Sequence, residues 1–126
     1  MSYQYDKENI FAKILRKEIP SKIVHETNHS LAFWDINPAA PVHILIIPKG
    51  PYINFDHFIT EASTEEIVDL NKAVAEVISK EKLSPSPTGG KGYRIIANTG
   101  LDGVQEVPHL HFHVLGGRNM GQMVLR

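Results

Sequence analysis

Three histidines near the carboxyl end of the chain alternate with apolar residues. His109, His111 and His113 are each separated by a single apolar side chain. On a β-strand, side chains two residues apart share one face and lie about 7 Å apart, whereas the same spacing on a helix would spread them around the axis. The pattern therefore predicts a strand over 108–117, with three imidazoles on one face and the apolar side chains in the core on the other.

Three interpretations of these histidines are open. One is a solvated strand face without function, although three of the seven histidines fall within five residues. Another is a zinc site, because imidazole commonly binds zinc and a catalytic zinc often has three protein ligands; no clear fourth ligand and no His-Glu-x-x-His helix accompany it. The last is nucleophilic catalysis, because neutral imidazole can attack phosphorus and leave again. His43, on a different predicted strand, could then complete a proton relay.

Composition narrows the class of protein. The chain has 126 residues, the size of one domain spanning 1–126, and no cysteine, which excludes disulfides, thiolate metal sites and thiol catalysis. A net charge of -1 argues against binding to a nucleic-acid polymer, but not against a small phosphorylated ligand. The polar N-terminus and an apolar run of only 44–47 give no signal peptide and no membrane segment, so we expect a cytoplasmic protein.

Hydrophobic spacing places the elements that would position these residues. An apolar stripe predicts a helix over 6–18, ended by Pro20, and a capping box of Ser63 and Glu66 predicts a second helix to about Lys82. The glycine-rich segment 89–92 has neither the spacing nor the hydroxyl residue of a P-loop and is interpreted as a flexible loop. Further strands are predicted over 23–27, 30–36, 43–48 and 93–98, and the continuous apolar run of 43–48 indicates cover on both faces.

The segment from His109 to Leu115 matches the His-φ-His-φ-His-φ-φ signature, with φ apolar, of the histidine triad (HIT) superfamily. The chain also resembles the Hint branch of that superfamily, the histidine triad nucleotide-binding proteins, in the segments 9–20, 32–38, 41–43 and 115–118. The resemblance covers almost the whole chain. It implies an α+β fold, with an antiparallel sheet of about five strands and two helices. It also implies a homodimer joined through the second helix and an adjoining strand.

The resemblance also implies an activity. Hint proteins are purine nucleoside phosphoramidases that hydrolyse the P–N bond of adenosine or guanosine phosphoramidates, and can act on aminoacyl-adenylates, with no metal or cofactor. By resemblance, His111 is the nucleophile, His113 contacts the phosphate, the backbone of His109 orients the His111 ring, and His43 joins the proton relay. Two alternatives stay open: a dinucleoside polyphosphate hydrolase or nucleotidyl transferase of another HIT branch, and a nucleotide-binding interaction module with vestigial activity.

Further residues are implied to bind the purine nucleotide. Asp35 would hold the ribose hydroxyls, and Asn98, Gln105 and Glu106 would line the phosphate site. The apolar base slot corresponds to Phe11, Ile14, Ile19, Phe33 and Ile36. Val104 replaces a usual glycine, and Glu106 stands where many eukaryotic members carry serine and bacterial-type relatives carry glutamate. The tail 121–126 also departs from the expected pattern. His25, His29 and His57 are expected to be ordinary surface or turn residues.

Overall fold

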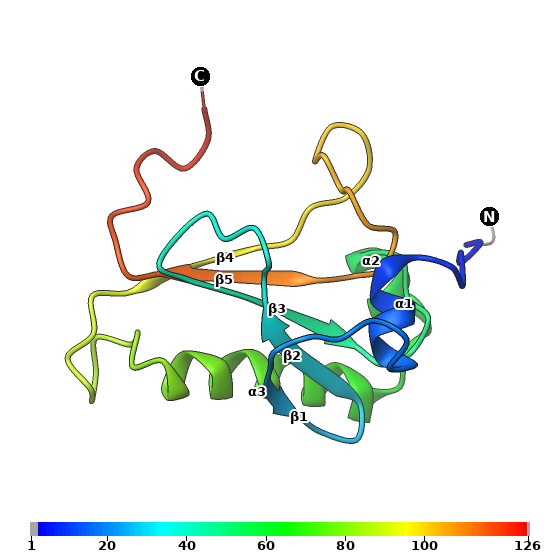
Figure 1. Ribbon diagram of the computed structural model, residues 1–126, viewed down its shortest axis with the longest axis horizontal. Helices are drawn as coiled ribbons and strands as arrows, with labels where there is room; N and C mark the ends of the chain where they lie inside the picture. Colours follow the sequence, from blue (N-terminus) through cyan, green and yellow to red (C-terminus); the bar gives the residue numbers. More distant parts are fainter. Residues whose placement is uncertain (1–2, 126) are drawn as a thin grey trace.

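The computed structural model describes residues 3–125, which form a five-stranded antiparallel sheet with three helices. The strands are β1 (Ile23–Glu26), β2 (Ser30–Trp34), β3 (Val42–Pro48), β4 (Tyr93–Ile96) and β5 (Phe112–Gly116), in the spatial order β1-β2-β3-β5-β4 (Figure 1). The helices are α1 (Ile10–Leu15), α2 (Phe55–Glu61) and α3 (Thr64–Lys80). The predicted α+β fold is confirmed, with three helices in place of the two expected.

Two apolar clusters cover the two faces of the sheet. On one face, the apolar stripe of α3 packs against Ile44 and Ile46 of β3. On the other, Leu45 and Ile47 pack with Phe11 from α1. β3 is therefore buried on both faces, as its continuous apolar run predicts, and it pairs with β5 along the middle of the sheet (Figure 1).

α3 begins where the sequence predicts. The Ser63 hydroxyl accepts a hydrogen bond from the Glu66 amide, and the Glu66 carboxylate accepts one from the Ser63 amide, so the capping box is present. The helix ends at Lys80, two residues before the predicted end. Across residues 3–125, the structure has no helix with both the length and the apolar character needed to cross a membrane.

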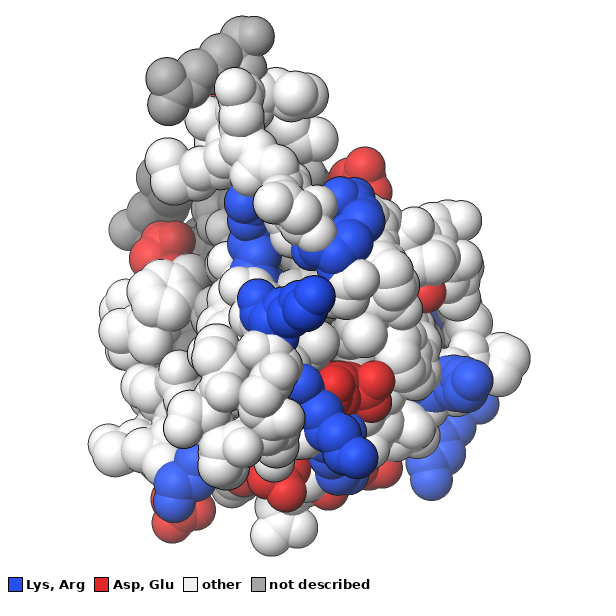
Figure 2. Space-filling model, turned by 90° about the vertical axis from the view of Figure 1, so that its left-hand side faces the viewer, with Lys and Arg blue, Asp and Glu red and all other residues white. Residues whose placement is uncertain are grey.

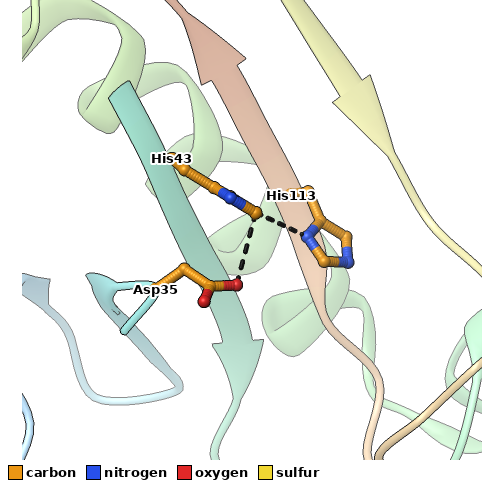
Figure 3. Close-up of side chains that lie close together, drawn as sticks. All are labelled: Asp35, His43 and His113. Atoms are coloured by element: carbon orange, nitrogen blue, oxygen red, sulfur yellow. Dashed lines mark hydrogen bonds and ion pairs between the residues drawn. The ribbon is translucent and has the colours of Figure 1, made fainter. Parts of the chain in front are cut away.

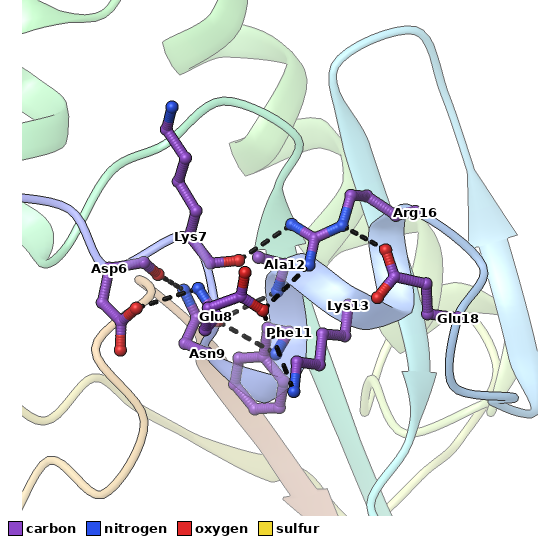
Figure 4. A network of polar contacts seen from close by, with 9 residues as sticks. All are labelled: Asp6, Lys7, Glu8, Asn9, Phe11, Ala12, Lys13, Arg16 and Glu18. Atoms are coloured by element: carbon purple, nitrogen blue, oxygen red, sulfur yellow. Dashed lines mark hydrogen bonds and ion pairs between the residues drawn. The ribbon is translucent and has the colours of Figure 1, made fainter.

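The first helix is shorter than the predicted range 6–18. The Asn9 side chain accepts hydrogen bonds from two amides of the first turn, so Asn9 caps the helix and α1 begins at Ile10. Beyond the other end, Lys17 adopts a left-handed conformation with φ 64°, which the helix cannot continue through. The residues before Asn9 remain beside the helix, where Arg16 donates a hydrogen bond to the Lys7 carbonyl (Figure 4).

Hydrophobic spacing does not predict α2, which has only seven residues and is capped by the Asn54 side chain. This helix changes the place of one histidine. His57, expected on the surface or in a turn, is buried in α2 and stacks on Tyr3 with ring centroids 4.1 Å apart. The expectation for His57 is therefore wrong, because the turn expected there is a helix that packs inward. His25 lies on β1 and His29 in the turn after it.

Candidate active site

The histidine segment keeps the predicted alternation but not the predicted strand. β5 covers only the second half of 108–117, so His113 is the one histidine of the three within it. Before β5, the Leu110 amide donates to the Tyr52 carbonyl at 2.8 Å and not to the neighbouring strand. Leu110 and Val114 still pack in the α3 cluster, which confirms that the apolar positions face the core.

His109 is fully buried, and both of its ring nitrogens have partners. Its Nε2 lies 2.8 Å from the Pro48 carbonyl oxygen, and its Nδ1 lies 2.5 Å from the Tyr5 hydroxyl. A carbonyl oxygen can only accept, so Nε2 carries the proton and Nδ1 accepts from the hydroxyl. Burial lowers the pKa of His109 to about 4, so the ring is neutral at pH 7. The sequence pattern places His109 on the same strand face as the other two histidines. In the structure, His109 is instead buried and held by two hydrogen bonds.

His111 has the protonation state that a nucleophile needs. Its Nδ1 lies 2.7 Å from the carbonyl oxygen of His109, so Nδ1 carries the proton and Nε2 keeps a free lone pair. Burial lowers the pKa of His111, which keeps the ring neutral at pH 7. Phe11 packs edge-on against it with ring centroids 4.9 Å apart. The contact expected between the His109 backbone and the His111 ring is therefore present.

His43 and His113 come together because β3 and β5 are adjacent, and they form a hydrogen-bonded pair. His43 Nδ1 accepts from the Ala39 amide at 3.0 Å, so the proton of the neutral ring is on Nε2. That Nε2 lies 2.9 Å from Nδ1 of His113, which accepts it (Figure 3). Burial and the neighbouring imidazoles lower the pKa of His113 to about 4. The tautomers of both rings are therefore set by their neighbours.

Asp35 closes this group from the end of β2. One carboxylate oxygen, Oδ2, lies 3.4 Å from Nε2 of His43 (Figure 3). The other accepts a hydrogen bond from the Asn37 amide at 2.8 Å. Burial lowers the pKa of His43, and the negative charge of Asp35 acts in the opposite direction. The carboxylate can thus stabilise a positive charge on the histidine pair when a proton passes through it.

The metal interpretation changes in the structure. Among residues 3–125, the groups that converge are Asp35, His43 and His113, whose ligand atoms lie within 4.8 Å of one another, and not the three alternating histidines. A carboxylate and two imidazoles are a donor set that zinc accepts. A metal on Nε2 of His43 would, however, require the proton on Nδ1, where the Ala39 amide already donates. The local hydrogen bonding therefore favours an imidazole pair over a metal site.

A pocket of about 190 Å³ opens between α1, the end of β2 and the histidine segment. Seven residues predicted for the site line it: Phe11, Phe33, Asp35, Ile36, Glu106, His111 and His113. Six lining residues that sequence reasoning did not select are Ile10, Pro20, Ser21, Trp34, Leu45 and Val107. Pro20, Trp34 and Val107 neighbour selected positions in the sequence, but no residue-type signal marks them. The pocket is mostly apolar with few polar groups, as ligand sites are.

Four other predicted binding residues lie elsewhere. Ile14 packs against the apolar cluster that contains Phe11 and Phe33, but it lines a different hollow and not this pocket. Ile19 and Asn98 are half-buried outside the lining. The Gln105 side chain donates to two backbone carbonyls, those of Ile53 at 2.7 Å and Val107 at 3.0 Å, so it holds the loop that leads to the histidines.

Basic side chains gather at the end of the sheet that lies beside the last turn of α3 (Figure 2). Lys82, Lys91, Arg94 and Arg118 line two adjoining hollows there. Arg94 donates to the carbonyls of residues 121 and 122, and Arg118 donates to the Ala39 carbonyl at 2.7 Å. The arginines thus hold the tail and, through Ala39, support the loop whose amide fixes the His43 tautomer.

Comparison with known proteins identifies the family of the chain. The HIT domain matches residues 16–120, and the chain belongs to the HIT domain family. An uncharacterized HIT-like protein of Azospirillum brasilense is 52% identical over 126 residues, which is 100% of this chain and 99% of the relative. A solved HIT family hydrolase of Clostridium thermocellum is 41% identical with a TM-score of 0.81, covering 95% of this chain and 99% of its own. A histidine triad nucleotide-binding protein of Candida albicans is 33% identical with a TM-score of 0.75, covering 85% of this chain and 73% of its own.

Proposed function

We propose that the protein is a purine nucleoside phosphoramidase of the Hint type, which hydrolyses the P–N bond through a nucleotidyl-histidine intermediate on His111. The observation that carries the proposal is the hydrogen bond from Nδ1 of His111 to the His109 carbonyl, which leaves the Nε2 lone pair free in a pocket. The resemblance to a hydrolase and to a nucleotide-binding protein of the same family supports a nucleotide substrate.

The reaction proceeds in two steps at phosphorus. The His43–His113 pair first takes up a proton from water. Nε2 of His111 then attacks the phosphorus atom, the P–N bond of the substrate breaks, and the amine leaves with the proton that the pair gives up. Water then attacks the same phosphorus, the P–Nε2 bond breaks, and the pair takes up the proton that the water loses. Asp35 stabilises the cationic state of the pair in both steps, because its carboxylate lies 3.4 Å from His43.

The rest of the pocket binds the nucleoside. The apolar side chains of Phe11, Phe33 and Ile36 would contact the purine, and Asp35 would accept hydrogen bonds from the ribose hydroxyls. Glu106 lies at the mouth of the pocket, exposed to solvent. Its negative charge would favour a cationic leaving amine over an acidic one.

The test compares His111→Ala with the wild-type protein on an adenosine phosphoramidate, with His25→Gln, outside the pocket, as the matched control. Loss of the nucleophile should lower kcat by more than about 10⁴-fold, beyond the usual worth of general acid–base help. Quenched turnover of labelled substrate should trap a nucleotide on His111. Near wild-type activity of His111→Ala would contradict the assignment.

The same assay separates the alternatives. Faster turnover of a dinucleoside polyphosphate than of a phosphoramidate would favour another HIT branch. Nucleotide binding without turnover of either substrate would favour an interaction module. Stoichiometric zinc in the purified protein, with activity lost on chelation, would favour the metal site.

We also propose a homodimer. β4 is an edge strand of the sheet, and its outward side chains Tyr93 and Ile95 are 44% and 47% exposed. An exposed edge with large apolar side chains is a surface that proteins usually cover. Light scattering on the purified protein should therefore give the mass of a dimer, and a monomeric mass at micromolar concentration would contradict this proposal.

A further inference from the structure

We propose that Tyr5 is a positioning residue for the nucleophile, acting on His111 through the ring and backbone of His109. The structural part of this inference stands on contacts between described residues. Its catalytic consequence rests on the proposed function of His111. Tyr5 lies outside the sheet and 104 residues away from His109 in the sequence, so no local pattern connects the two.

Tyr5 and His109 contact each other through both a hydrogen bond and their rings. The hydroxyl lies 2.5 Å from Nδ1, and the two rings meet edge-on with centroids 5.5 Å apart and an interplanar angle of 70°. The opposite nitrogen of the same ring donates to the Pro48 carbonyl at 2.8 Å. The ring is therefore held at both ends, and only one tautomer satisfies both partners.

The backbone of His109 connects this anchored ring to the nucleophile His111. The carbonyl oxygen of His109 accepts the proton on Nδ1 of His111 at 2.7 Å, and this bond leaves the lone pair on Nε2. The segment that carries the carbonyl lies before β5, where the sheet ladder does not hold it. The Leu110 amide of the same peptide unit donates to the Tyr52 carbonyl at 2.8 Å, so two contacts orient the His109 carbonyl: this hydrogen bond and the anchored His109 side chain. Tyr5 supplies one of the two anchors of that side chain.

The segment that carries Tyr5 is itself fixed on both sides. Before it, the Tyr3 hydroxyl donates to the Asp56 carboxylate at 2.6 Å. After it, Asn9 caps α1, and Arg16 donates to the Lys7 carbonyl at 2.8 Å (Figure 4). The N-terminal segment therefore acts as a strap that places the Tyr5 hydroxyl on His109, while the following helix places Phe11 against His111.

The experiment compares Tyr5→Phe with Tyr3→Phe. Each variant removes one tyrosine hydroxyl from the same segment, but only the first removes a partner of His109, so Tyr3→Phe controls for loosening of the strap. The readouts are kcat and KM on an adenosine phosphoramidate and the ¹⁵N shifts of the histidine rings, which report the protonated nitrogen without any substrate.

In the wild-type protein, His109 should be protonated at Nε2 and His111 at Nδ1. Tyr5→Phe should mix the tautomers of His111 and lower kcat by about ten-fold with KM changed by less than about two-fold, because a misplaced reacting group costs rate and not binding. Tyr3→Phe should keep the wild-type ¹⁵N pattern and kcat within about two-fold.

A wild-type His109 protonated at Nδ1, or a Tyr5→Phe variant with unchanged His111 shifts and unchanged kcat, would overturn the inference. If Tyr5→Phe does not fold, the wild-type ¹⁵N shifts of His109 still decide whether its Nδ1 is an acceptor. If the wild-type protein does not hydrolyse the phosphoramidate, the proposed function fails, while the ¹⁵N comparison still tests the positioning of His111 by Tyr5.

Discussion

Lowering the pH from 7 to 5 should destabilise the protein by about 2 kcal/mol through His109 alone. His109 is 0% exposed, and burial lowers its pKa to about 4 in the folded state. In the unfolded chain the same ring has a pKa of about 6.5. Between these two values the unfolded state binds a proton that the folded state does not, so the free energy of unfolding falls as the pH falls.

The size of this loss in the free energy of unfolding follows from the folded and unfolded pKa values of His109. At pH 5 an unfolded histidine is almost fully protonated, whereas His109 in the folded protein is hardly protonated. This difference raises the equilibrium constant of unfolding about 30-fold, which corresponds to about 2 kcal/mol. Above pH 6.5 the contribution of this group is complete, and below about pH 4 its loss stops near 3 kcal/mol. His43, His111 and His113 also have pKa values lowered by burial and act in the same direction.

The assay is urea unfolding at pH 7 and pH 5, at one protein concentration because a dimer would make stability concentration-dependent. His109→Gln removes the titrating ring and keeps a side chain that can donate a hydrogen bond. Whatever its stability at pH 7, this variant should lose about 2 kcal/mol less than the wild-type protein between the two pH values. Equal losses in the two proteins would refute the argument that His109 is a buried neutral group.

Three other substitutions test the site and the backbone. Asp35→Asn should lower kcat and raise KM by about ten-fold each, because the carboxylate supports the histidine pair and would hold the ribose; an unchanged kcat would contradict the first role and an unchanged KM the second. His43→Gln should lower kcat by about 10²-fold with little change in KM, because the proton path through His113 is broken, and a rise in KM alone would contradict this. Val104→Gly should raise the free energy of unfolding by about 1 kcal/mol in urea, because Val104 has φ 56°, a conformation unfavourable for a β-branched residue, and an unchanged midpoint would show that no strain is stored there.

Local interactions made the main elements of the fold predictable. The α3 capping box joins residues only three apart, and the run of apolar residues in β3 requires burial wherever the strand lies. The alternation of histidine and apolar residues likewise predicts which side chains face the core. The two short helices were harder to place, because α2 is only seven residues long and the start of α1 depends on one capping side chain, Asn9.

The sequence alone determined that three imidazoles and His43 were available and that the chain resembled the HIT superfamily. Only the tertiary structure decided what each imidazole does, because a ring's protonated nitrogen depends on whether a carbonyl, an amide or a hydroxyl faces it. His43 meets His113 through the register of two strands that are 70 residues apart, and His109 meets Tyr5 across 104 residues. The same packing turned one histidine of the triad into a buried anchor and left another with its lone pair in the pocket.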